Sequence, residues 1–212
     1  MTEMTDLRQI PRRRQAAFPA SVQLTVVAQA EASGADAPAL AGFIASSFSP
    51  LVAEAAARCL TAAGRSPLVH GNTPAGTPPS TVSDAEDGAR RKDGAAARRT
   101  GIVILSASGD VATNVSIAQG VDSGARLGPL LFFQAVPNAV AGHVAARWGL
   151  TGPVVCLSPA GDALAEGYAV AELLILDDDA DEVLVIVAEQ SDLDGDRDHA
   201  LAQLVCDKGV QP

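Results

Sequence analysis

The stretch TGIVILSASGD (residues 100–110) decides the fold class. Its apolar residues run on from Gly101 to Leu105 without polar interruption. A continuous run of this kind predicts a strand buried on both faces, as in a parallel sheet that helices cover on each side. Asp110 then provides a helix N-cap, and we expect a helix from there to about Gln119. The stretch therefore predicts one strand–helix unit of an α/β domain.

The same pattern continues on both sides of this unit. Before it, an alternating run predicts a strand at 21–30, and apolar residues at helical spacing predict a helix at 50–64. After it, we expect a helix at 137–148, a strand at 152–158, a helix at 160–176 and a strand at 181–189. Residues 200–206 fit a short strand or a short helix. This order predicts an α/β domain whose mixed, mostly parallel sheet has helices on both faces.

The length of 212 residues suggests one domain, at roughly 150 residues per domain. We expect a flexible N-terminal arm at 1–20, the domain itself at 21–206 and a tail at 207–212. Within the domain, residues 66–99 lose the apolar pattern and gather prolines, acidic residues and arginines. We expect this segment to be a disordered loop.

Charge and hydropathy exclude several classes of partner. The chain carries 25 acidic and 15 basic residues, a net charge of -10, which disfavours binding to nucleic acid and to anionic membranes. None of its apolar runs reaches the roughly 18 to 20 residues of a membrane span, and its start lacks the apolar core of a signal peptide. We therefore expect a cytoplasmic protein.

Motifs for cofactors and metals are absent from the sequence. It contains no glycine-rich phosphate loop and no zinc-protease motif, and its three histidines are scattered. Cys59, Cys156 and Cys206 are widely spaced in apolar surroundings, so we expect small buried residues and neither a disulfide nor a zinc site. The aspartates of 192–198 predict a hydrated acidic loop rather than a calcium site. We expect no cofactor and no metal.

The predicted elements also carry a family resemblance. TGIVILSASGD, followed by PNAVAGHVAARWGLTGP (137–153) and then by AGDALAEG (160–167), resembles the N-terminal half of a β-ketoacyl synthase of the thiolase fold. The most specific piece is PN-x-x-A-G-x-[VI]-A…GL-x-GP. The resemblance covers about residues 20–190 and implies a thiolase-like half domain.

The resemblance also implies where a nucleophile would lie. In this family a cysteine stands eight residues after the proline of the GP pair, at a helix N-terminus that favours a thiolate. Counting from Pro153, that position is Gly161, which has no side chain. The family's two histidines belong to its C-terminal half, outside the part that is similar here. Cys156 lies in a predicted buried strand and is not expected to replace the nucleophile, so we expect no catalytic residue.

Relatives without the cysteine indicate a different role. Ketosynthases form two-fold dimers through their N-terminal halves, and chain length factors pair with an active ketosynthase and shape its acyl tunnel. The resemblance thus implies a non-catalytic, chain length factor-like subunit of type II polyketide or fatty-acid and polyene synthesis. It would bind an active ketosynthase and meet acyl carrier protein through that complex. The tunnel or interface candidates are Val115, Gln119, Phe132, Phe133 and His143.

Two alternatives remain open at this point. The chain could be a stand-alone enzyme that uses Ser158, Asp162 or His143 for acyl transfer or dehydration on a carrier-bound substrate. It could also be a structural homodimer without a ketosynthase partner. Phe132 and Phe133 are equally compatible with ordinary core packing beside Leu130 and Leu131, and His143 with an ordinary helix-surface position.

Overall fold

A computed structural model describes residues 22–68, 98–191 and 198–209. Its elements, in chain order, are β1 (Leu24–Ser33), the short 3-10 helix η1 (Gly34–Asp36), α1 (Phe48–Ala62), β2 (Thr100–Leu105), α2 (Val111–Asp122), α3 (Pro129–Gln134), α4 (Pro137–Trp148), β3 (Val154–Leu157), α5 (Ala163–Leu176), β4 (Glu182–Glu189) and β5 (His199–Asp207).

The strands form one mixed sheet in the order β1-β5-β4-β2-β3. β2 runs parallel to both β3 and β4, whereas β5 runs antiparallel to β4 and β1. Leu105, the last residue of β2, is level with Leu157 on β3 and Val187 on β4, so these three strands end at the same edge of the sheet. The predicted α/β fold with a mixed sheet is confirmed, and the segment at 200–206 is a strand.

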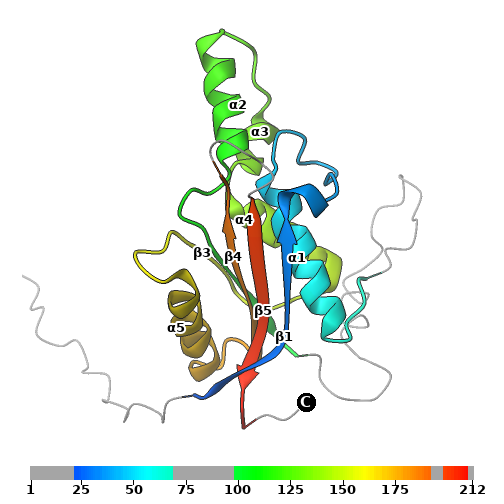
Figure 1. Cartoon of the computed structure of the whole chain (residues 1–212), viewed down its shortest axis with the longest axis vertical. Helices are drawn as coiled ribbons and strands as arrows, with labels where there is room; N and C mark the ends of the chain where they lie inside the picture. The colour runs from blue at the N-terminus through cyan, green and yellow to red at the C-terminus, as the bar shows by residue number, and fades with distance from the viewer. Residues whose placement is uncertain (1–21, 69–97, 192–197, 210–212) are drawn as a thin grey trace, which may run out of the picture.

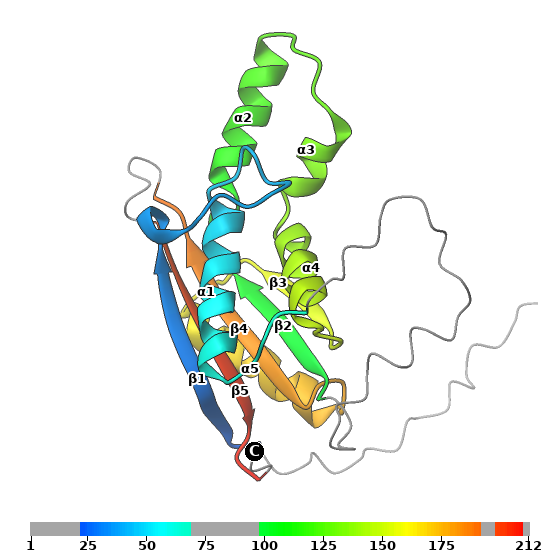
Figure 2. The ribbon, with the colours of Figure 1, turned by 90° about the vertical axis from the view of Figure 1, so that its right-hand side faces the viewer.

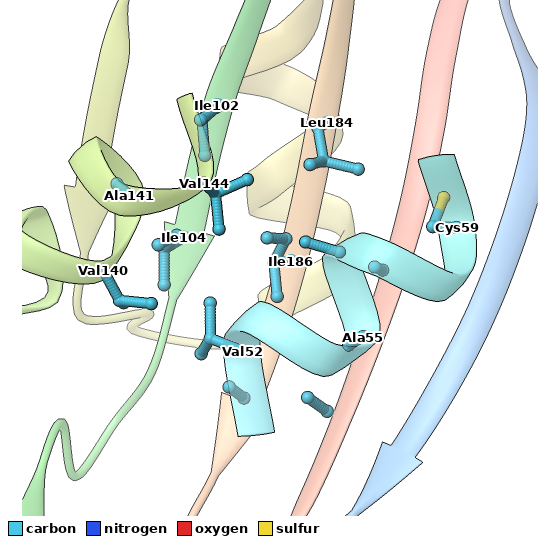
Figure 3. Close-up of a cluster of buried hydrophobic side chains, with 14 of the residues drawn as sticks. Val52, Ala55, Cys59, Ile102, Ile104, Val140, Ala141, Val144, Leu184 and Ile186 are labelled. Carbon is cyan, nitrogen blue, oxygen red and sulfur yellow. The ribbon is translucent and has the colours of Figure 1, made fainter. Parts of the chain in front are cut away.

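Helices cover both faces of the sheet, as the continuous apolar strands predict. Figures 1 and 2 show α1 and α4 on one face and α5 on the other. The larger core lies under α1 and α4, where Val52 and Val144 meet Ile104 and Ile186 of the central strands (Figure 3). The smaller core lies under α5. Together these layers bury every residue of β2.

A glycine allows α5 to approach the sheet closely. A Cβ atom at Gly167 would lie 2.6 Å from Val185 Cγ1 and 2.8 Å from Leu105 Cδ1, which is closer than packed atoms come. The helix therefore rests on the sheet at the one position of its inner face that has no side chain. This contact sets the distance between α5 and the strands β2 and β4.

Local signals in the sequence set most helix boundaries. Asp110 caps α2 by accepting a hydrogen bond from the Thr113 N–H at 3.0 Å, and Asp162 caps α5 in the same way from Ala165 at 2.9 Å. α4 begins at Pro137, as predicted. It ends at Gly149, whose φ of 66° lies in the left-handed region that favours glycine.

Several expectations need correction. β1 covers 24–33 rather than 21–30, and the helix α3 was not predicted, since its apolar residues show no helical stripe. Cys156 is only half-buried, because β3 forms the edge of the sheet. Asp198 is 2% exposed and accepts a hydrogen bond from the Ser191 N–H at 2.8 Å, so it does not belong to a hydrated loop.

Other expectations fall on residues outside the described ranges. These are the N-terminal arm at 1–20, most of the loop at 66–99 (residues 69–97), the aspartate run at 192–197 and the last residues of the tail. Among the helices that are described, none is long and apolar enough to cross a membrane.

Candidate functional site

The candidate site lies where β2, β3 and β4 end together. The loop after β2 is tied to the end of β4 by Glu189, whose carboxylate accepts hydrogen bonds from the Ala107 N–H at 2.8 Å and the Ser108 hydroxyl at 3.2 Å. It is tied to β3 by the Ser106 N–H, which donates to the Leu157 carbonyl at 3.1 Å. These bonds hold the three strand ends and their loops in one arrangement.

The first turn of α2 is anchored on the same strand ends. Asp110 is buried and accepts both the N–H and the hydroxyl of Thr113, the latter at 2.8 Å. The Val111 N–H donates to the Gln190 side-chain oxygen at 2.7 Å. The Gln190 amide in turn donates to Asp198 at 3.2 Å. The base of α2 is thus fixed by Gln190, directly after β4, which Asp198, directly before β5, holds in turn.

From this base, α2 and α3 extend past the sheet as an arm, which we call the α2–α3 arm (residues 111–136) (Figures 1 and 2). Its apolar side chains are exposed to an unusual degree: Phe133 is 72% and Phe132 51% exposed, and Val115 48%. Further large apolar residues of the arm are also exposed, namely Val121, Leu130 and Val136. This set of exposed large apolar side chains makes the arm a candidate interaction surface.

The arm unites four of the five predicted tunnel or interface residues. Val115 and Gln119 are exposed on α2, and Phe132 and Phe133 on α3. The alternative that the two phenylalanines fill this chain's core is wrong, because both are more than half exposed. His143 lies apart from them on α4, where its ring meets Phe43 edge-on with ring centres 6.1 Å apart.

The turn before α5 contains the position at which the family has its cysteine. Gly161 lies directly before the N-cap Asp162. The Gly161 N–H donates to the Glu166 carboxylate at 2.7 Å, and the Ala160 N–H donates to it at 3.0 Å. A carboxylate from the first turns of α5 therefore already occupies the N–H groups beside position 161.

The structure describes the surroundings of the residues that the stand-alone enzyme alternative would use. The Asp162 carboxylate caps α5, and the His143 imidazole is partly enclosed beside Phe43. Burial and the nearby Arg147 lower the pKa of His143. Within the described ranges, no hydrogen bond joins Ser158, Asp162 and His143 to one another, and the buried Nε2 atom of His143 has no hydrogen-bond partner.

Burial changes the acidity of the three cysteine thiols. Burial raises the pKa of the Cys156 thiol to about 11 and that of the Cys59 thiol to about 11, and it also raises the pKa of Cys206. A thiol with so high a pKa is almost wholly protonated near neutral pH and reacts slowly. The described residues also contain no group of three or more His, Cys, Asp or Glu side chains that could hold a metal ion.

Comparison with known proteins finds a family match for the part of the chain that contains the candidate site. Residues 94–194 match the family described as Beta-ketoacyl synthase, N-terminal domain. This part of the chain is β-ketoacyl synthase-like. The match contains β2, β3, β4 and the candidate site between them, so the resemblance predicted from the sequence is confirmed. No curated protein sequence matches the chain.

Solved structures show the same fold. One chain of a ketosynthase (ApeO) in complex with its chain length factor (ApeC) from Xenorhabdus doucetiae matches with 18% identity and a TM-score of 0.50, covering 80% of this chain and 61% of that chain. A β-ketoacyl synthase from Burkholderia phymatum matches with 16% identity and a TM-score of 0.50, covering 76% of this chain and 42% of that chain. The ketosynthase-like chain thus spans less than two thirds of the length of either protein.

Sequence reasoning missed two features of the site. The first is the contact of Glu166 with the turn at 160–161; the acidic residue in the first turn of α5 was a visible signal, but its direction depends on the turn geometry. The second is the extent of the apolar surface on the arm beyond the four candidates. The absence of an apolar stripe in α3 was the available sign that its side chains do not all face one core.

Proposed function

We propose that this chain is a non-catalytic, chain length factor-like subunit that pairs with an active ketosynthase and helps to shape its acyl tunnel. The observation that carries the proposal is the α2–α3 arm, whose large apolar side chains have no cover within the described part of the chain. Burial of a phenylalanine side chain contributes roughly 1.5 to 3 kcal/mol. A partner that covers Phe132 and Phe133 would therefore gain substantial binding energy.

The edge strand β3 supports pairing at a second place. β3 is the last strand of the sheet and pairs only with β2 among the described strands. The first and last residues of β3, Val154 and Leu157, are 40% and 39% exposed. An unpaired edge offers backbone N–H and C=O groups to a strand of another chain. Strand pairing at this edge is the dimer contact that the family resemblance implies.

The turn before α5 supports a non-catalytic role for this chain. Gly161 cannot form a thioester, and the N–H groups next to it already bind Glu166. The condensation chemistry would then belong to the partner, and acyl carrier protein would deliver substrate to the partner's cysteine. This chain would contribute the wall formed by Val115, Gln119, Phe132 and Phe133.

Binding of variants to a ketosynthase tests the proposal. Phe133→Glu places a charge at the most exposed phenylalanine of the arm and should weaken the complex by at least tenfold, since buried aromatic residues dominate interface energies. Leu173→Glu is the matched control, because Leu173 is 59% exposed on α5, on the opposite face of the sheet. Equal affinities of the two variants for the ketosynthase would refute the proposed role of the arm.

A further inference from the structure

The turn that leads into α5 holds a carboxylate against the backbone at position 161. Backbone N–H groups at the start of a helix attract anions, because the first turns leave donors unpaired and the helix dipole is positive there. Such a position can favour a thiolate or a developing oxyanion. In this chain the N–H groups of Ala160 and Gly161, which directly precede the N-cap Asp162, are bound by a carboxylate of the protein itself.

That anion is the side chain of Glu166. Its Oε1 atom accepts from the Gly161 N–H at 2.7 Å and from the Ala160 N–H at 3.0 Å, and its Oε2 atom lies 3.2 Å from the same Ala160 nitrogen. Asp162 caps the helix separately through Ala165. The turn thus holds two carboxylates, of which Glu166 faces position 161 and Asp162 faces into the helix.

The geometry also shows what a side chain at position 161 would meet. A Cβ atom built on Gly161 lies 3.5 Å from Glu166 Oε1, an ordinary van der Waals contact, and Glu166 Oε1 is its nearest neighbour outside the adjacent residues. A cysteine therefore fits without displacing the backbone. Its sulfur would nevertheless lie close to a negative charge, which opposes ionisation of the thiol.

We infer that the Glu166 carboxylate, which binds the N–H groups of Ala160 and Gly161, would keep position 161 unreactive even if a cysteine stood there. Position 161 has no reactive side chain, and the N–H groups of Ala160 and Gly161 are bound by Glu166. Restoring the thiol alone would leave it protonated beside a carboxylate. This inference concerns contacts within the chain and holds whether or not a ketosynthase binds.

The test compares thiols introduced by Gly161→Cys with and without the Glu166 charge. The full chain is alkylated with iodoacetamide between pH 6 and 10, and the modification of the peptide that contains position 161 is followed by mass spectrometry, which separates it from Cys59, Cys156 and Cys206. Gly161→Cys combined with Glu166→Gln should show a thiol pKa about one unit or more below that of Gly161→Cys alone. At pH 7 this corresponds to a several-fold faster alkylation.

Gly161→Cys combined with Glu172→Gln is the matched control. Glu172 lies on the same helix as Glu166, about two turns further along, and Glu172→Gln changes the net charge by the same amount as Glu166→Gln. The thiol of this double variant should have the same pKa as the thiol of Gly161→Cys alone. The same pKa in all three variants would overturn the inference.

A measurement on the unmodified chain guards against variants that do not fold. The amides of Ala160 and Gly161 should exchange with deuterium more slowly than their sequence alone dictates, because a carboxylate holds both protons. Exchange of both amides at the rate of an unstructured peptide would equally overturn the inference.

Discussion

The guanidinium of Arg65 forms an ion pair with the buried carboxylate of Glu182, 117 positions further along the chain. Glu182 is 1% exposed and also accepts the Thr100 hydroxyl, and its second oxygen lies 3.6 Å from the Arg98 guanidinium. One carboxylate on the central strand β4 thereby connects the chain before residue 69 with the chain after residue 97. Burial of a charge is tolerated here because each oxygen has a positive partner.

Glu182→Ala should be strongly destabilising, because it leaves two arginines facing a cavity. Removal of one partner of a buried pair costs about 3 to 5 kcal/mol. Glu54→Ala is the matched control: its pair with Arg58, at 2.7 Å, is more exposed and should contribute only about 0.3 to 0.5 kcal/mol. Urea unfolding followed by circular dichroism measures both. Similar losses for the two variants would show that Glu182 is not a structural centre.

Gly167→Ala should destabilise the domain by about 1 to 3 kcal/mol, because the added Cβ would overlap Val185 and Leu105. Gly142→Ala offers an opposite control. A Cβ at Gly142, in the middle of α4, meets no atom within 4 Å, so the exchange should stabilise the chain by roughly 0.5 to 1 kcal/mol. The free energies of unfolding should therefore move in opposite directions. A stabilising Gly167→Ala would contradict the close approach of α5.

Acidification should reveal the enclosed position of His143. Burial and Arg147 lower its pKa in the folded chain, so the unfolded chain takes up the proton first. The stability gained from the neutral imidazole is present above the unfolded pKa of about 6.5 and is lost as the pH falls through the lower folded value. The free energy of unfolding should fall more between pH 8 and pH 5 for the unmodified chain than for His143→Gln. Parallel pH profiles would place the imidazole in solvent.

Enlarging the proposed tunnel wall should shorten the product. Val115→Phe adds bulk to the exposed face of α2, and in a complex with an active ketosynthase it would fill space that the growing chain occupies. Product lengths measured by mass spectrometry should shift downward, whereas Leu173→Phe on α5 should leave them unchanged. An unchanged distribution after enlargement at Val115, Gln119, Phe132 and Phe133 in turn would exclude this wall.

Much of the fold could be predicted because local patterns and tertiary packing agree. The unbroken apolar run of β2 reflects burial on both faces, and Pro137 and Gly149 stand at the ends of α4, where each is favoured for its own backbone geometry. The strand at 199–207 could not be distinguished from a helix, because its extended shape comes from pairing with β1 and β4, two distant segments.

The site was predictable in position but not in its contacts. The spacing from Pro153 that the family resemblance implies puts Gly161 two residues before α5, which begins at Ala163. That Gly161 stands where the family has its cysteine stays a prediction. That Glu166 would turn back to Gly161 depends on the backbone of the turn, which no periodicity encodes. Phe132 and Phe133 read equally well as core residues, because composition does not tell whether an apolar residue is covered by its own chain or by another.

We propose that this chain is one half of a ketosynthase pair. The most direct measurement is co-expression with the ketosynthase encoded nearest to it, followed by size-exclusion chromatography with light scattering and a condensation assay on the complex and on each subunit. We expect a one-to-one complex that condenses acyl substrates, with no activity in either subunit alone. A chain that forms a stable homodimer and ignores the ketosynthase, or that acts alone on a carrier-bound substrate, would contradict it.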